Sequence, residues 1–260
     1  MTAKDSRLLA VCGKGGVGKT AFTAMMSKVL MDSEDAGNLL LIDADPAKGL
    51  TIALDVEVKR TMGEVREEII EASRRATQEE KQQLSEMIDY MVLEALTEYE
   101  RFGLLAMGRS ESKGCFCPVN TILRGMIEEL SGNFDTILID GEAGVEQINR
   151  QVMRRVDTLI IVSDATSRGL QTASLVKQMV EDEGVIQCGR LGLVLNRVQG
   201  NEELVEEAAA KVGVEVFGYI PQDEAIAYHD LVGKPLTELP PDSPGLLAVR
   251  EIVERKILLA

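Results

Sequence analysis

Gly13-Lys14-Gly15-Gly16-Val17-Gly18-Lys19-Thr20 decides the fold of this 260-residue chain. An apolar run, Arg7-Leu8-Leu9-Ala10-Val11-Cys12, precedes this stretch, and a helical pattern follows it from Lys19 to Met31. A glycine-rich loop between a strand and a helix is typical of a phosphate-binding P-loop. Its glycines let backbone N–H groups turn inward, and the helix N-terminus adds a favourable dipole. In the general pattern the Lys19 ammonium reaches the β- and γ-phosphates and the Thr20 hydroxyl binds magnesium.

Further apolar runs follow the first one, at spacings that leave room for helices between them. Because most of these runs are unbroken, they predict strands that are buried on both faces, as in a parallel sheet covered by helices. We therefore expect a single α/β domain over residues 1–260, with a mostly parallel P-loop NTPase sheet of about seven strands and with ligands at the carboxyl ends of the strands. The further runs are residues 39–43, 104–107, 136–140, 158–162, 191–195 and 214–220.

Residues 61–101 interrupt this alternation. Apolar residues recur there at helical spacing among many charges, as Leu84, Met87 and Ile88 illustrate. The segment predicts an inserted helical hairpin, broken near Thr77. Its charged face is either a solvated surface or a docking surface for a partner.

The composition limits the possible partners. The chain carries 28 Lys and Arg against 43 Asp and Glu residues, which gives a formal net charge of -15. This charge opposes non-specific binding to nucleic acids and to anionic lipids. In addition, no apolar run approaches the roughly 20 residues that a membrane-spanning helix needs. We expect a cytoplasmic protein with no nucleic-acid partner and no stable membrane association.

Lys14 is not part of the general P-loop pattern. With this lysine the loop resembles the deviant Walker A class of P-loop ATPases, which includes MinD, ParA and nitrogenase iron protein. The resemblance implies an ATPase that forms a homodimer around ATP, in which Lys14 crosses the interface to the partner's phosphates. Such a lysine would parallel an arginine finger supplied in trans. The alternative is that Lys14 is a solvated loop residue.

Two acidic segments resemble the switch regions of that class. Leu41-Ile42-Asp43-Ala44-Asp45-Pro46 resembles switch I, which implies that Asp45 orients the attacking water and that Asp43 lies near the magnesium shell. For Asp43, capping of a turn is the alternative. Ile139-Asp140-Gly141-Glu142-Ala143-Gly144 resembles Walker B followed by switch II, with Asp140 on magnesium through water. The residues implied in catalysis are Lys14, Lys19, Asp45 and Asp140.

The same resemblance implies which residues bind ATP or ADP with Mg²⁺. Asn196 and Arg197 follow a strand and resemble the adenine contact, and Ile220-Pro221-Gln222-Asp223 resembles the loop that closes over the adenine. Magnesium is assigned to Thr20, Asp43 and Asp140, directly or through water. The implied nucleotide-binding residues are Gly13, Lys14, Gly15, Gly16, Val17, Gly18, Lys19, Thr20, Ala21, Asn196, Arg197, Pro221, Gln222 and Asp223.

Cys115 and Cys117 form the close pair among the four cysteines of the chain. They are expected in a loop before a helix over residues 119–130. Two thiolates one residue apart supply half of the four ligands that a soft metal takes. A symmetric dimer would bring four sulfurs to its two-fold axis, so we hypothesise an intersubunit site for nickel or zinc. The alternative is a pair of inert thiols.

This Cys-x-Cys segment, together with Lys14 and residues 140–146, makes the chain similar to the CooC-type ATPases, which insert nickel into carbon monoxide dehydrogenase. The resemblance implies a metallochaperone with a carbon monoxide dehydrogenase-like client enzyme. Four thiolates also suit a [4Fe-4S] cluster, so an ATP-gated iron–sulfur electron donor is the alternative. A partitioning or membrane-positioning ATPase is a third possibility, because the apolar pattern near residues 246–257 also fits an amphipathic tail.

Overall fold

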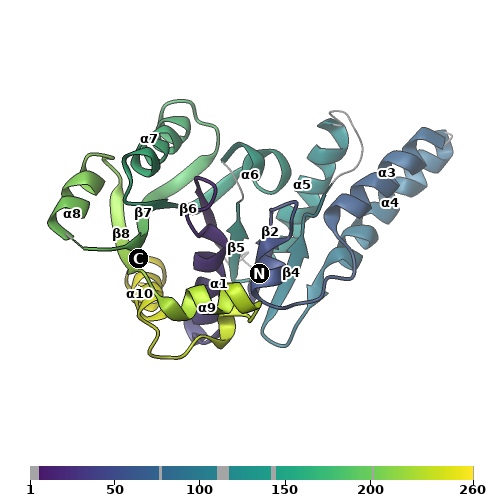
Figure 1. Cartoon of the computed structure of the whole chain (residues 1–260). Coiled ribbons are helices and arrows are strands. Elements are labelled where there is room, and N and C mark those ends of the chain that lie inside the picture. The colour runs from purple at the N-terminus through teal and green to yellow at the C-terminus, as the bar shows by residue number, and fades with distance from the viewer. Residues whose placement is uncertain (1–5, 76–77, 110–116, 142–144, 201, 260) are drawn as a thin grey trace.

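The computed structural model describes residues 6–75, 78–109, 117–141, 145–200 and 202–259. Within these residues, eight strands form one sheet in the order β3-β4-β2-β5-β1-β6-β7-β8, with helices on both faces (Figure 1). Every neighbouring pair is parallel except β3 with β4. The strands are β1 (Arg7–Gly13), β2 (Leu39–Asp43), β3 (Thr97–Glu98), β4 (Phe102–Ala106), β5 (Thr136–Asp140), β6 (Arg155–Asp164), β7 (Gln187–Val198) and β8 (Glu215–Pro221).

The helices lie between the strands along the chain, as expected of a doubly wound α/β sheet. Short 3₁₀ turns lie at Glu34–Ala36 and Leu236–Glu238, and a π-helical turn at Val253–Leu258 extends the last helix. The α-helices are α1 (Lys19–Met31), α2 (Gly49–Ala53), α3 (Met62–Arg75), α4 (Gln78–Ala95), α5 (Cys117–Ser131), α6 (Val145–Gln151), α7 (Ser167–Glu181), α8 (Glu202–Ala210), α9 (Glu224–Val232) and α10 (Pro244–Ile252).

The predicted fold class is confirmed, and the inserted hairpin is present as α3 and α4. Thr61 and Glu64 begin this hairpin with a capping box, in which the Glu64 N–H donates to Thr61 Oγ1 at 3.2 Å and the Thr61 N–H donates to Glu64 Oε2 at 2.7 Å. The described residues form eight strands, one more than the seven apolar runs identified in the sequence. The strand that was missed, β3, is only two residues long and has no alternation of apolar residues that a sequence pattern can reveal.

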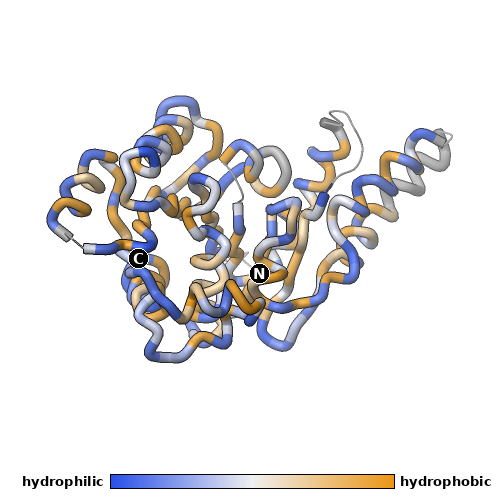
Figure 2. The backbone as a smooth tube through the Cα atoms, viewed as in Figure 1, coloured by the Kyte–Doolittle hydropathy of each residue, from blue (hydrophilic) through white to orange (hydrophobic). Residues whose placement is uncertain are grey.

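Two hydrophobic layers cover the sheet. Neighbouring residues of β1 point to opposite faces, because side chains alternate along a strand. Ala10 and Cys12 pack in the layer that holds α3 to α7, and Leu9 and Val11 pack in the layer that holds α1, α2 and α10. The helices around the sheet carry alternating hydrophobic and hydrophilic residues along their length (Figure 2). None of the helices in the described part of the chain combines the length and the apolar character that crossing a bilayer requires.

The register of the central strands brings the acidic strand ends together. On β5, Asp140 lies opposite Asp43 of β2 on one side and opposite Val11 of β1 on the other. The loop that leaves β1 therefore emerges beside both carboxylates. As predicted for a parallel α/β sheet, the candidate residues share the carboxyl edge.

Candidate functional site

The glycine-rich loop joins β1 to α1 and depends on glycine at two close approaches. Gly13 has a φ of 141°, and a Cβ there would lie 2.1 Å from the carbonyl oxygen of Val162 on β6. Gly18 has a φ of 88°, and a Cβ there would lie 2.4 Å from Asn196 Nδ2. Residues with a Cβ would be strained at both positions and would collide with these neighbours. The loop is thus held closely against β6 and β7.

The two lysines of the loop differ in their surroundings. The Lys19 side chain is buried (7% exposed), and its ammonium donates to the Lys14 carbonyl at 3.1 Å, so that it spans the inside of the loop. Lys14 itself is partly exposed, beside the exposed Gly15 and Gly16. Within the described residues, the Lys14 ammonium forms no ion pair. Among the described residues, the charge of Lys14 is therefore not neutralised by a partner.

Asp140 ends β5 in a buried position (1% exposed). Its Oδ1 accepts a hydrogen bond from the Thr23 hydroxyl at 3.1 Å, whereas its buried Oδ2 has no hydrogen-bond partner among the described residues. Burial, followed by the nearby charge of Asp43, raises the pKa of Asp140 to about 6, although the Thr20, Thr23 and Lys19 side chains oppose this shift. A buried carboxylate oxygen without a partner, beside the Thr20 hydroxyl, fits the hard oxygen ligands that magnesium prefers.

Asp43 is as buried as Asp140, but both of its oxygens have protein partners. The Asp45 N–H donates to Asp43 Oδ1 at 3.1 Å, and Thr51 donates to Oδ2 from its N–H at 3.0 Å and from its hydroxyl at 2.8 Å. Burial is the main reason that the pKa of Asp43 is raised. This arrangement favours the turn-capping alternative, because direct coordination of a metal by Asp43 would compete with its bonds to α2 and to the Asp45 backbone.

Asp45 follows in the turn between β2 and α2. Its Oδ1 accepts from the Ala47 N–H at 2.8 Å. A Cβ on Gly49 would lie 3.1 Å from Asp45 Oδ2 and 3.5 Å from Thr20 Oγ1, which means that these two oxygens approach the same small space. The second carboxylate oxygen of Asp45 and the hydroxyl of the P-loop threonine therefore both border Gly49.

Asn196 and Arg197, at the end of β7, contact the P-loop rather than standing apart from it. Asn196 Nδ2 donates to the Val17 carbonyl at 2.8 Å, and its Oδ1 accepts from the Arg197 N–H at 2.9 Å. The Arg197 guanidinium donates to the Gly16 carbonyl at 3.3 Å. Both residues therefore donate hydrogen bonds to carbonyls of the P-loop. The sequence resemblance implies an adenine contact for them and does not predict these bonds.

Asp223 anchors two helices. Its Oδ1 accepts from the Ala225 N–H at 2.8 Å, and its Oδ2 accepts from the Ser243 hydroxyl at 2.6 Å and from the Gly245 N–H at 2.9 Å. Burial opposes ionisation of Asp223, but hydrogen bonds from Ser243 and from nearby backbone N–H groups outweigh it and hold the pKa below its ordinary value. The Asp223 carboxylate is thus committed to the N-termini of α9 and α10.

Pro221 ends β8 beside Asp223, and the exposed Gln222 follows it. The Gln222 N–H donates to the Val198 carbonyl of β7 at 3.3 Å. The predicted adenine loop therefore adjoins the strand that carries Asn196.

Cys115 and residues 142–144 lie outside the described residues. Cys117 is the first residue of α5, so the expectation that it lies in a loop before a helix over residues 119–130 is wrong. Pro118 explains the difference, because proline is favoured in the first turn of a helix, where its missing N–H is not needed. In the described part of the chain, no group of three or more His, Cys, Asp or Glu residues is arranged to hold a metal ion.

The two other cysteines lack the character of metal ligands. Cys12 is fully buried in β1, and burial raises the pKa of its thiol to about 12. Cys188 is half-buried on β7, where burial also raises its pKa. Thiols that resist ionisation are poor ligands and nucleophiles.

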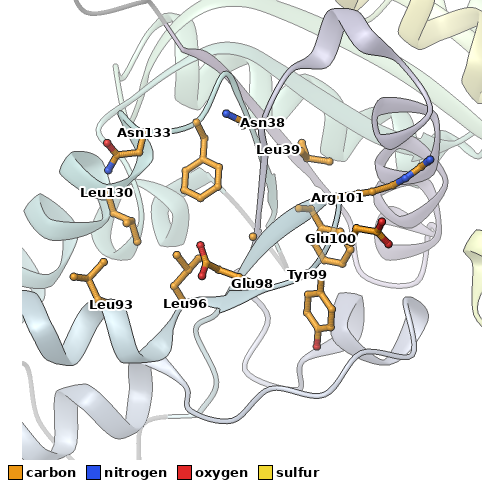
Figure 3. A pocket seen from close by; sticks show the side chains of 13 residues that line it. Asn38, Leu39, Leu93, Leu96, Glu98, Tyr99, Glu100, Arg101, Leu130 and Asn133 are labelled. Atoms are coloured by element: carbon orange, nitrogen blue, oxygen red, sulfur yellow. The ribbon is translucent and has the colours of Figure 1, made fainter.

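A pocket of about 480 Å³ lies at the amino ends of β2 and β4 (Figure 3). The P-loop follows β1 at the carboxyl ends of the strands, and so lies at the other end of the sheet. Leu96, Leu130 and Phe134 form part of its apolar wall. The side chain of Arg101 at its rim pairs with Asp32 at 3.3 Å. None of the residues that line the pocket is a candidate nucleotide-binding residue.

Known proteins resemble this chain along nearly its whole length. A family model described as an AAA domain matches residues 7–183. An uncharacterised ATP-binding protein of Methanocaldococcus jannaschii is 38% identical over 254 residues, which cover 96% of this chain and 98% of that protein. The carbon monoxide dehydrogenase accessory protein CooC of Rhodospirillum rubrum is 29% identical over 245 residues, with 90% of each chain covered.

Two solved structures are also similar to this chain over nearly its whole length. The cell division ATPase MinD of Pyrococcus furiosus has a TM-score of 0.68 and 25% identity, covering 98% of this chain and 100% of its own. MinD of Pyrococcus horikoshii, solved in complex with Mg-ADP, has a TM-score of 0.65 and 26% identity, covering 96% and 95% of the two chains.

Proposed function

This chain belongs to the AAA domain family of MinD- and ParA-like P-loop ATPases, and on that premise we propose that it is a dimerising metallochaperone. In this proposal ATP hydrolysis controls a metal site that two subunits share through Cys115 and Cys117. The cargo is nickel or zinc, and the client is a carbon monoxide dehydrogenase-like enzyme. The observation that carries the proposal is the combination of a second P-loop lysine with a Cys-x-Cys segment, supported by the similarity to CooC.

In this proposal, the residues of the P-loop and of the neighbouring strand ends have separate roles in phosphoryl transfer. Lys19 binds the β- and γ-phosphates from inside the loop, and Lys14 contributes its charge to the nucleotide of the partner subunit. Thr20 and Asp140 hold magnesium, which when bound neutralises phosphate charge. Asp45 orients the attacking water. Phosphoryl transfer needs positioning and charge neutralisation more than a strong base, so these groups suffice.

A packed connection between α5 and α6 supports coupling of the two sites. The Arg124 guanidinium on α5 donates to the Asn149 carbonyl of α6 at 2.7 Å. The Arg154 N–H, which follows α6, donates to Glu128 Oε1 of α5 at 3.1 Å. Because α6 closely follows Asp140 along the chain and α5 begins at Cys117, a movement of α6 would be passed to the segment that carries the cysteines.

Metal analysis tests the cargo site. The chain is purified without oxygen, and its metal content and absorption spectrum are measured with and without Mg-ATP. We expect about one nickel or zinc ion per dimer, bound in the ATP state. The double variant Cys115→Ser, Cys117→Ser should lose it, while Cys188→Ser, the control, should keep it. Metal retained by the double variant would refute the site, and iron with acid-labile sulfide would favour the electron-donor alternative.

Lys14→Ala tests the shared nucleotide site. This variant should bind ATP with nearly unchanged affinity, but should lose ATP-induced dimerisation and about 10³-fold or more of its turnover, as expected for a charge supplied in trans. Turnover is measured by phosphate release, and association by light scattering. Lys211→Ala removes an exposed lysine near α8 and serves as a charge-matched control. Unchanged turnover in Lys14→Ala would rule out the trans role.

A further inference from the structure

Thr23 is a buried polar residue on the P-loop helix to which the sequence motifs assign no role. It lies one turn after Lys19 on α1 and is 0% exposed. Its Oγ1 is 3.0 Å from the Lys19 carbonyl oxygen and 3.1 Å from Asp140 Oδ1. The second of these contacts joins residues 117 positions apart in the chain, from α1 to the end of β5.

The hydroxyl group can donate only one hydrogen bond, although two acceptors lie within reach. The charged carboxylate is the stronger acceptor, so the proton of Thr23 goes to Asp140 when that group is ionised. This bond fixes the rotation of the carboxylate about its Cβ–Cγ axis. It therefore also fixes Asp140 Oδ2, the buried oxygen that has no partner among the described residues.

Ser27, one turn further along α1, shows what a buried hydroxyl does when it has only a structural role. Its Oγ donates to the Thr23 carbonyl at 2.7 Å, the common i to i−4 bond of a helical serine, and it is as buried as Thr23. Thr23 has the same type of local acceptor in the Lys19 carbonyl. Because the Lys19 carbonyl alone would give the Thr23 hydroxyl a hydrogen-bond acceptor, the need for an acceptor does not explain why Thr23 lies against Asp140.

We propose that Thr23 is a positioning residue of the magnesium–nucleotide site, which holds Asp140 so that its Oδ2 faces the metal position beside Thr20. This role rests on the part of the proposed function in which the P-loop binds a nucleotide together with Mg²⁺. It does not depend on a metal cargo at the cysteines. Partners of this kind behind a metal-binding group typically contribute about tenfold or more to metal affinity or activity.

The test compares the affinity for ADP in the presence of Mg²⁺ and in its absence, measured by calorimetry, with turnover of ATP as a second measurement. Thr23→Val keeps the shape of the side chain but removes the hydroxyl. It should reduce the enhancement of ADP affinity by Mg²⁺ about tenfold, while the affinity for ADP alone stays the same. Thr23→Ser keeps the hydroxyl and should restore the enhancement. Thr23→Ala, a second deletion of the hydroxyl, should show the same loss.

Ser27→Ala is the matched control, because it removes an equally buried hydroxyl that does not contact Asp140. It should leave the Mg²⁺ enhancement at the level of the unaltered chain. The proposal is overturned if either hydroxyl deletion at Thr23 keeps the full enhancement, or if Ser27→Ala loses as much. If the unaltered chain binds Mg-ADP but does not turn over ATP, the proposed function fails, while the role of Thr23 is still decided by the binding measurements.

Discussion

Asp43 and Asp140 lie side by side at the ends of neighbouring strands, and their surroundings give them different roles. Both carboxylates are buried and the pKa of each is raised, in the first place by burial. Thr51 and the Asp45 backbone engage both oxygens of Asp43, whereas only one oxygen of Asp140 has a partner among the described residues. The first carboxylate therefore organises a turn, whereas the second leaves one buried oxygen without a hydrogen-bond partner among the described residues, as the proposed magnesium site requires.

The raised pKa of Asp140 predicts a pH-dependent cost to the stability of the nucleotide-free chain. Because its pKa in the folded state, about 6, exceeds the ordinary value of 3.8, the folded state holds the proton more tightly than the unfolded state. The stabilisation that the protonated Asp140 carboxyl gives to the folded state is fully present below about pH 4 and is lost as the pH rises through about 6. Asp140→Asn should therefore be more stable than the unaltered chain at pH 7.5, by up to about 3 kcal/mol.

Urea unfolding of both proteins between pH 4 and pH 8, without nucleotide or magnesium, measures this difference. The difference in the free energy of unfolding between the two proteins should approach zero at pH 4. A difference that did not vary with pH would show that ionisation of Asp140 is not its cause.

Asp45→Asn should bind ATP and hold it without hydrolysis, because the amide is a weaker acceptor for the attacking water. We expect turnover to fall about 10²-fold or more while ATP affinity changes little. Retained nucleotide is identified by chromatography after denaturation, and phosphate release gives the rate. Asp55→Asn is a suitable control, since Asp55 is exposed, has a φ of 53° that asparagine tolerates, and lies just beyond α2. Normal turnover in Asp45→Asn would remove the residue from the mechanism.

At the scale of the elements, the sequence predicts best where one local pattern governs the structure. The loop from Gly13 to Thr20 and the α3–α4 hairpin follow from glycine spacing and helical periodicity, and both are present. The start of α5 at Cys117 was missed, because the boundary depends on a proline in the first turn. The contacts of Asn196 with Val17 join residues 179 positions apart, and such tertiary pairings leave no local pattern.

The anchoring of α2 by Thr51, which bonds Asp43 only 8 residues earlier in the chain, yields a prediction about this element. Thr51→Val removes the hydroxyl bond to Asp43 Oδ2 but retains the backbone bond. The free energy of unfolding should fall by about 1–2 kcal/mol, because a buried carboxylate loses a partner. Urea denaturation measures this loss. Thr172→Val, whose exposed hydroxyl bonds only its own helix α7, should change stability by less than about 0.5 kcal/mol.

At the scale of the whole molecule, the net charge of -15 opposes the association of two copies. The proposed contact of Lys14 with the partner's phosphates would be buried in the dimer, and salt would then screen it less than the repulsion between the two acidic surfaces. ATP-induced dimerisation should therefore strengthen when the salt concentration rises from about 20 to about 200 mM. Sedimentation at a fixed ATP concentration measures it. Weaker association at the higher concentration would mean that attraction between exposed charges dominates the interface.

The pairing of β2 with β5 has a consequence for evolution and for protein engineering. Asp43 lies opposite Asp140 because the two strands are in register along their length, from Leu39 opposite Thr136 onward. Side chains alternate between the faces of a sheet, so the insertion or deletion of one residue in either strand would turn its apolar side chains to the wrong layer and misplace its terminal carboxylate. Chimeras between relatives should tolerate changes of length in exposed loops, whereas crossovers within these two strands must preserve the residue count.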